Sequence, residues 1–224
     1  MRKVNKVLRY LYVPVIFAVI GYLVIYIGLA PVFSIAKSVG GMIVKDRAPN
    51  FNKELSVIYD PEAHKVVEQV NDTVSVADVV WPKDGAVYAN ISCAEVGMNE
   101  NLYWGDSANI LDVGIGQYSG SYLPGYGRPL LICGHRSTFG RYIKSAEVGH
   151  VYTITTNYGV YEYEITDIKI MTAAEAEKQV GTWLLQEEEQ LIYYTCYPFE
   201  SGYGKATERC FVFAKKISGP SVEH

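Results

Sequence analysis

Residues 191–200 read LIYYTCYPFE, and this stretch sets both the expected fold and the expected site. Its first residues are apolar, β-branched or aromatic, which are the types that favour β-strands. The run reaches Cys196, and two residues later comes Pro198, which cannot donate to a sheet ladder. A buried structural cysteine needs no such stop. The pattern therefore predicts a strand that presents the thiol at its tip, where other groups can reach it.

The chain from residue 85 onward is typical of a β-rich domain, since short strand-forming runs alternate with turn residues. Thr172 and Glu175 have the spacing of a capping box and predict a helix over about residues 173–190. The runs expected to form strands are GAVYANISCAEV (85–96), ENLYWG (100–105), GRPLLICGH (127–135), HVYTITTNYGVYEYEITDIKI (150–170, a hairpin turning at 157–159), LIYYTC (191–196) and RCFVFAKKI (209–217). About eight strands with few helices predict a mainly β fold, a closed eight-stranded barrel.

An uncharged apolar run occupies residues 11–33, and about 20 such residues cross a bilayer. The basic residues ahead of it are Arg2, Lys3, Lys6 and Arg9. This imbalance predicts a single-pass protein of the cell membrane with a cytoplasmic N-terminus and the rest of the chain outside. A cleaved signal peptide is the alternative, but its apolar region is normally about 7–15 residues long, which favours an uncleaved transmembrane helix.

The expected layout has five parts along the chain. They are a basic cytoplasmic N-terminus (1–9), a transmembrane signal anchor (10–33), an extracytoplasmic tether with a short helix starting at Asp60-Pro61 (34–84), the β-barrel (85–218) and a tail (219–224). The formal net charge of the chain is −4, and because four basic residues precede residue 10, the remainder carries −8. Nucleic acid requires clustered positive charge, so it is not an expected partner.

The four cysteines are Cys93, Cys133, Cys196 and Cys210, and each is considered separately. A domain of this size builds a core without disulfides, and the chain has no C-x-x-C spacing and only four histidines. No zinc site is therefore indicated. Cys133 and Cys210 lie within apolar runs and are expected to be small buried thiols, as is Cys93 in the first strand.

A cysteine nucleophile needs a nearby base or positive charge, because a free thiol is only a few per cent thiolate at neutral pH. His135 follows the apolar run PLLIC and a glycine, so it also lies at a strand end. Arg209 begins the last strand and offers a planar set of donors for a carbonyl or an oxyanion. The alternatives are His64, His150 and His224 for the base, and Arg136 and Arg141 for the cation.

Three stretches carry a resemblance to a known family. ILDVGIGQYSGSYLPGYGRPLLICGHR (110–136) leads to His135, YTC (194–196) ends at Cys196, and Arg209 follows thirteen residues after that cysteine. In this order, with each element at a strand edge, the chain resembles the sortases, which are cysteine transpeptidases of the Gram-positive bacterial surface. The ending TCYPF is most like the class D branch.

The resemblance covers about residues 85–217 and implies a mechanism. Cys196 as thiolate would attack a peptide bond in an LPxTG-like sorting signal, His135 would protonate the leaving amine, and Arg209 would hold the signal and stabilise the tetrahedral intermediate. Thr195 would line the substrate groove. An amine of a cell-wall precursor or of a pilin lysine would then resolve the thioester. The resemblance implies no cofactor and no metal, and leaves calcium dependence open.

Two positions depart from the family pattern. Gln117 stands where many members carry a histidine that is not catalytic, and Cys93-Ala94 stands where the first strand usually ends Ile-Pro. Two other classes stay open as well. One is another cysteine hydrolase, although papain-like enzymes place Cys before His and L,D-transpeptidases place the two close together, not 61 residues apart. The other is a membrane-tethered β-barrel that binds a partner.

Overall fold

The structure is a computed structural model that describes residues 16–22, 73–200 and 206–223. The chain divides into two units, Met1–Gly40 and Gly41–His224. In the first unit, residues 16–22 are helical. Among the residues described, no helix has the length and apolar character needed to cross a membrane. Most of the predicted anchor and the helix predicted at Asp60-Pro61 lie outside the described residues.

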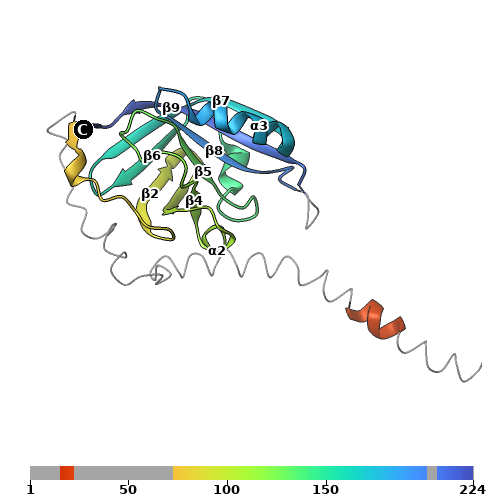
Figure 1. The fold of residues 1–224 in the computed structure, drawn as a ribbon. Coiled ribbons are helices and arrows are strands. Elements are labelled where there is room, and N and C mark those ends of the chain that lie inside the picture. Colours follow the sequence, from red (N-terminus) through yellow and green to blue (C-terminus); the bar gives the residue numbers. More distant parts are fainter. Residues whose placement is uncertain (1–15, 23–72, 201–205, 224) are drawn as a thin grey trace, which may run out of the picture. The chain divides into compact units, whose positions relative to one another are not determined.

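Eight strands of the second unit close into a barrel, which confirms the predicted mainly β fold (Figure 1). They are β2 (Val87–Cys93), β3 (Met98–Trp104), β4 (Ile115–Gln117), β5 (Leu130–Cys133), β6 (Val151–Thr156), β7 (Val160–Thr172), β8 (Gln190–Tyr197) and β9 (Glu208–Ser218). Around the barrel the order is β2-β3-β4-β5-β8-β9-β7-β6, and β6 pairs back to β2. The pairs β3–β4 and β5–β8 are parallel, and the others are antiparallel.

The helical segments lie in the connections between strands. They are η1 (Val76–Asp78), η2 (Ala94–Val96), α2 (Ala108–Leu111), η3 (Arg141–Ser145) and α3 (Ala173–Leu184). The predicted capping box is present at the start of α3, where Thr172 and Glu175 bond reciprocally. The helix ends at Leu184 rather than near residue 190. Leu185 is its C-cap, Arg128 donates to the carbonyls of Leu185 and Gln186, and β8 begins soon after.

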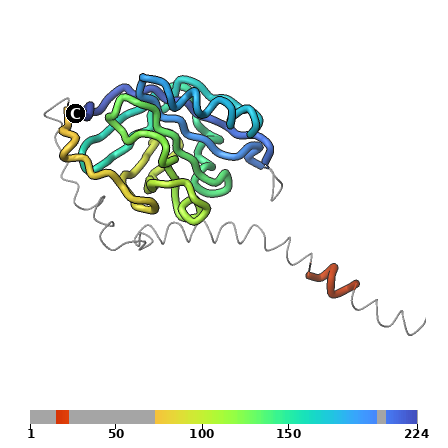
Figure 2. The backbone as a smooth tube through the Cα atoms, in the orientation of Figure 1, coloured from red at the N-terminus to blue at the C-terminus, as the bar shows by residue number. Residues whose placement is uncertain are grey.

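Two short strands pair outside the barrel. β1 (Thr73–Ser75) runs parallel to β10 (Ser221–Glu223), and the amide of Val222 also donates to the carbonyl of Gly125. These strands fall in the stretches that the sequence assigns to the tether and to the tail. Figure 2 shows the first described segment of the second unit, which begins at residue 73, lying beside the C-terminal end of the chain. The second unit thus joins its first and last described residues to each other.

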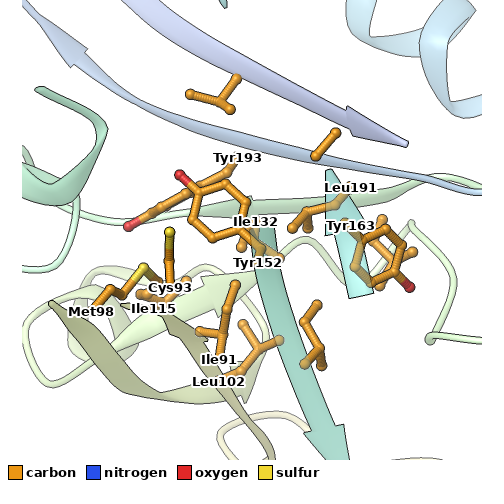
Figure 3. Close-up of a cluster of buried hydrophobic side chains, with 14 of the residues drawn as sticks. Ile91, Cys93, Met98, Leu102, Ile115, Ile132, Tyr152, Tyr163, Leu191 and Tyr193 are labelled. Atoms are coloured by element: carbon orange, nitrogen blue, oxygen red, sulfur yellow. The ribbon is translucent and has the colours of Figure 1, made fainter. Parts of the chain in front are cut away.

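The side chains of the barrel separate into an interior and an outer cluster. Alternation along β8 sends Leu191 and Tyr193 into the interior and Ile192 to the outer face. Figure 3 shows interior residues from several strands, including Tyr152, Tyr163 and Tyr193. The outer cluster lies beneath α3, where Trp183 packs edge-on against Phe211 and Phe213 with ring centroids 5.1 and 5.0 Å away.

Gln117, which departs from the pattern of the resembled family, is a fully buried residue of the interior. The hydroxyl of Tyr88 donates to its Oε1. Its Nε2 donates to Ser121 Oγ at 3.1 Å and to the carbonyl of Tyr122 at 2.8 Å. A buried amide is tolerated when its polar atoms are bonded. Gln117 therefore holds the loop after β4 against the barrel.

Glu189, immediately before β8, is the buried carboxylate of this end of the barrel, with 7% of its surface exposed. It accepts from the amides of Gly125 and Gly127 at 2.9 and 3.0 Å, and from the hydroxyl of Tyr163 at 2.7 Å. Lys216 Nζ lies 3.4 Å from its Oε2. A buried charge is stable only with such partners. Glu189 thus joins the loop at residues 118–129 to β7, β8 and β9.

We expect Glu189→Ala to lower the free energy of unfolding by about 3 kcal/mol, because it leaves two amides without their acceptor and removes the carboxylate that neutralises the partly buried Lys216. Urea denaturation of the purified chain measures this. The neighbouring Glu188→Ala is the matched control. It removes an exposed carboxylate 3.1 Å from Lys215 and should cost less than about 1 kcal/mol. Equal losses in the two variants would contradict the role given to Glu189.

Candidate active site

Strand β8 carries Cys196 on the outer face of the barrel. The preceding residue, Thr195, is buried, and Tyr194 packs against the outer cluster. Because residues two apart share a face of a strand, Cys196 lies on the same side as Tyr194. It is partly exposed and stands one residue before the end of β8, and the Tyr197–Pro198 peptide that follows is cis. The thiol is therefore presented at a strand tip, as the sequence predicts.

Arg209 lies directly opposite Cys196. In the antiparallel register of β8 and β9, Cys196 pairs with Arg209 and Thr195 pairs with Cys210. Directly paired side chains share a face and lie about 5 Å apart at Cβ. The structure thus brings the predicted cation beside the predicted nucleophile. Arg209 Nη1 donates to the carbonyls of Ala206 and Glu208 at 3.0 and 2.8 Å, which holds the guanidinium at the start of β9.

Two aromatic rings lie next to this pair on the same face of the strands. Tyr194 and Phe211 stack with centroids 5.1 Å apart, and each is two residues from one member of the pair. Burial raises the pKa of Tyr194, the thiol of Cys133 adds to this, and the charge of Arg209 acts in the opposite direction. The guanidinium is therefore close enough to Tyr194 to act on its ionisation. Tyr194 and Phe211 thus flank Cys196 and Arg209 along the same face of the two strands.

The structure brings His135 to the same end of the sheet as Cys196. Strands β5 and β8 are parallel neighbours, and Cys133 pairs with Tyr194. His135 and Cys196 each follow their paired residue by two positions. The amide of Gly134 donates to the carbonyl of Tyr194 at 3.4 Å, so contact between the chains continues past the end of β5. Parallel strands end at a common edge, which explains why residues remote in sequence meet here.

Thr195 has a different environment from the one that the family resemblance implies. It is 1% exposed, and its hydroxyl donates to the carbonyl of Gly134 at 2.7 Å. Alternation places it on the interior face, opposite to Cys196. In this structure the side chain ties the strand that carries Cys196 to the residue before His135. A contact of Thr195 with substrate stays a prediction from the resemblance.

The imidazole of His135 has a partner that the sequence alone does not reveal. Its Nε2 lies 3.8 Å from Oδ1 of Asp112, and the two side chains are 46% and 47% exposed. Asp112 caps the end of α2, just ahead of β4. The segment ILDVG offers no spacing signal that links it to His135. The pairing depends on where α2 is held, and Ile110 of this helix is buried against Val87 and Tyr103.

Arg136, the rival cation, is bonded to the loop that follows Cys196. Its Nη1 donates to the carbonyl of Pro198 at 3.1 Å. The bond joins the loop after β5 to the loop after β8. Arg141, the other rival, lies with its guanidinium carbon 4.9 Å from the centre of the Tyr142 ring and donates to the hydroxyl of Tyr142. Arg136 thus holds the loop after β8, and Arg141 packs against its neighbour Tyr142.

The remaining three cysteines are buried, as expected, and all four are free thiols. Burial raises the pKa of Cys93 to about 11, helped by the carboxylate of Glu95. Burial likewise raises the pKa of Cys133 to about 12 and of Cys210 to about 11. These three thiols stay protonated at neutral pH and are closed to reagents. Cys196 is therefore the one thiol of the described residues that combines access with a neighbouring cation.

A partly exposed thiol beside a guanidinium, with an imidazole on the adjoining strand end, suits nucleophilic attack on a carbonyl. The guanidinium offers donors to an oxygen that gains negative charge. The imidazole offers a proton to a departing group. These are the parts of a cysteine acyl-transfer site.

Comparison with known proteins agrees with this geometry. Residues 91–217 match the model of the sortase domain family. Sortase D of Bacillus subtilis (strain 168) is 30% identical over 137 residues, which cover 61% of this chain and 67% of that protein.

Solved structures share the fold. A sortase D5 transpeptidase of Clostridium perfringens aligns with a TM-score of 0.53 and 24% identity, covering 61% of this chain and 82% of the other. A Clostridium perfringens sortase C, solved with the C-terminal cell wall sorting motif, aligns with a TM-score of 0.52 and 22% identity, covering 61% and 73%. The matched residues include the whole stretch from His135 to Arg209. The chain therefore belongs to the sortase family of cysteine transpeptidases, and it is most like the class D sortases.

Proposed function

We propose that this protein is a membrane-anchored sortase that cleaves an LPxTG-like sorting signal. It then joins the carbonyl carbon of the cleaved bond, held as a thioester, to an amine. The acceptor is a cell-wall precursor or a pilin lysine. The observation that carries the proposal is the register at the end of β8, where Cys196 pairs with Arg209 while the parallel strand β5 leads to His135. The sorting motif in the related sortase C structure supports the substrate class. The reaction needs no cofactor.

The first half of the reaction breaks the peptide bond. The sulfur of Cys196, as thiolate, attacks the scissile carbonyl carbon and forms the C–S bond. The carbonyl oxygen gains the negative charge, and Arg209 stabilises it by donating hydrogen bonds. As the carbon–nitrogen bond breaks, the imidazolium of His135 gives its proton to the departing amine. The products are a thioester on Cys196, a neutral imidazole and the released C-terminal peptide.

The second half transfers the acyl group. An acceptor amine attacks the thioester carbonyl, and neutral His135 takes the proton that the amine loses. The C–S bond then breaks, which regenerates the thiolate and the imidazolium. Asp112 Oδ1, 3.8 Å from His135 Nε2, is placed to orient the imidazole ring through both halves of the reaction.

Two other functions would use the same barrel differently. A cysteine hydrolase would use the same nucleophile but would release the acyl group to water. A binding barrel would need no thiol at the strand tip. Cys196 is partly exposed, whereas the other three cysteines are buried, and this difference favours a reactive role for Cys196 over a structural one.

The proposal predicts transfer rather than hydrolysis. With a fluorescent LPxTG-type peptide and an added amine, the purified chain should form the amide product, and Cys196→Ala should form none because no thioester can arise. Mass spectrometry of the products distinguishes amide from free acid. Cys133→Ala is the matched control, since it removes a buried thiol, and it should retain transfer. Free acid alone at high amine concentration would assign the chain to the hydrolases.

The roles of the other residues predict an order of losses. His135→Ala and Arg209→Ala should each lower kcat/KM by about 100-fold or more, because one removes the proton donor and the other the oxyanion donors. Arg136→Ala should lose less than about tenfold, since its bond to the carbonyl of Pro198 supports the loop after β8. Steady-state peptide cleavage gives these values. If Arg136→Ala proved more damaging than Arg209→Ala, the cation would have to be reassigned.

The membrane anchor and the external location of the barrel are also proposed, on the basis of the uncharged run at residues 11–33 and the basic residues ahead of it. We expect the intact chain to fractionate with membranes of a Gram-positive host. Its barrel should be open to protease added outside protoplasts. Immunoblots of cells and medium test this. A shortened form released into the medium would indicate a cleaved signal peptide instead.

A further inference from the structure

The loop that carries His135 runs from Gly134 to Gly140, and its two ends lie against each other to form a neck. The carbonyl of His135 accepts from the amides of Thr138 and Gly140 at 3.0 and 2.7 Å. A side-chain carbon added at Gly134 would lie 2.9 Å from the Gly140 amide nitrogen, so the two ends of the loop touch. The backbone of His135 is therefore held by this closed loop, and its placement depends on what holds the loop.

Two hydroxyls on the interior face of β8 hold the loop. Tyr193 donates to the carbonyl of Phe139, and Thr195 donates to the carbonyl of Gly134. One bond is made at each side of the neck. A side-chain carbon at Gly140 would lie 2.2 Å from Thr195 Oγ1, which shows how closely the loop fits against β8. Strand β8 thus presents Cys196 on its outer face and holds the His135 loop with the inward side chains of Tyr193 and Thr195.

We propose that Tyr193 is a positioning residue for His135, acting through the carbonyl of Phe139. The proposal rests on the function proposed above, in which His135 is the proton donor. Tyr193 is fully buried, and its ring packs edge-on against Tyr152 with centroids 5.8 Å apart, so the hydroxyl is aimed by a rigid core (Figure 3). Phe139 is also buried. Loss of the hydroxyl therefore removes the donor to this carbonyl and weakens the hold of β8 on the loop.

The position of Cys196 does not depend on this bond. Cys196 is held by the backbone ladder with β9, in which every residue of β8 has a partner. The loss of the Tyr193 hydroxyl therefore displaces the proton donor and leaves the nucleophile and Arg209 in place. The positioning role of Tyr193 can therefore be measured. Every substrate needs the nucleophile Cys196, but only a leaving group that must be protonated needs His135.

The test compares two substrates in Tyr193→Phe, which removes the hydroxyl and keeps the ring. A sorting-signal peptide needs a proton on its leaving amine. The same acyl segment as a p-nitrophenyl ester does not, because nitrophenolate leaves unprotonated. We expect the single-turnover rate of acylation to fall at least tenfold with the peptide and less than about twofold with the ester, since small displacements of a catalytic group cost up to about 100-fold.

Tyr152→Phe is the matched control. Tyr152 packs against the same ring in the same interior, but its buried hydroxyl has no hydrogen-bond partner among the described residues. Its removal should change neither rate. If Tyr193→Phe folds poorly, Thr195→Val removes the other hydroxyl bond to the loop and should give the same difference between substrates.

The outcomes separate this inference from the function on which it rests. Retained peptide acylation in His135→Ala would overturn the proposed function itself. Where His135→Ala loses peptide acylation but Tyr193→Phe keeps it, the positioning role alone is overturned. Equal losses with peptide and ester in Tyr193→Phe would show a general defect of the fold and would also overturn it. A loss confined to the peptide supports the proposal.

Discussion

The structure depends above all on the backbone hydrogen bonds of β8, which lies between a parallel neighbour, β5, and an antiparallel neighbour, β9. The parallel ladder delivers His135 to the edge where β8 ends, and the antiparallel ladder sets Arg209 across from Cys196. A shift of one residue in either ladder would turn a whole strand to the other face. The buried tyrosines and aliphatic residues of the interior prevent such a shift. Packing of the core thus determines the geometry of the site.

Much of the barrel and of its reactive end follows from local patterns. Strand-forming runs, the proline after Cys196, and the strand-end positions of His135 and Arg209 are all visible in the sequence, because each depends on neighbours within a few residues. The capping box at Thr172 is a similar case. Such features need no knowledge of the fold. What they leave open is which strand lies beside which.

The features that the sequence did not reveal depend on contacts between distant segments. Asp112 lies beside His135 because of the way α2 packs, and the pairing of β1 with β10 joins the first and last described segments of the unit. The inward direction of Thr195 is a different case. Adjacent residues of one strand face opposite sides, so once Cys196 is assigned to the outer face, alternation already turns Thr195 inward. The contact with substrate that the family resemblance implies for Thr195 stays a prediction.

The tyrosine-rich interior gives both ends of the barrel a common construction. A phenol fills core volume with its ring and carries a donor to the rim of the core. At the start of β8, Tyr163 donates to Glu189, which in turn holds the amides of Gly125 and Gly127. At the end of β8, Tyr193 donates to the loop that carries His135. Residues that stabilise the core therefore also fix the loops, and substitutions far from the surface act on the placement of the reactive groups.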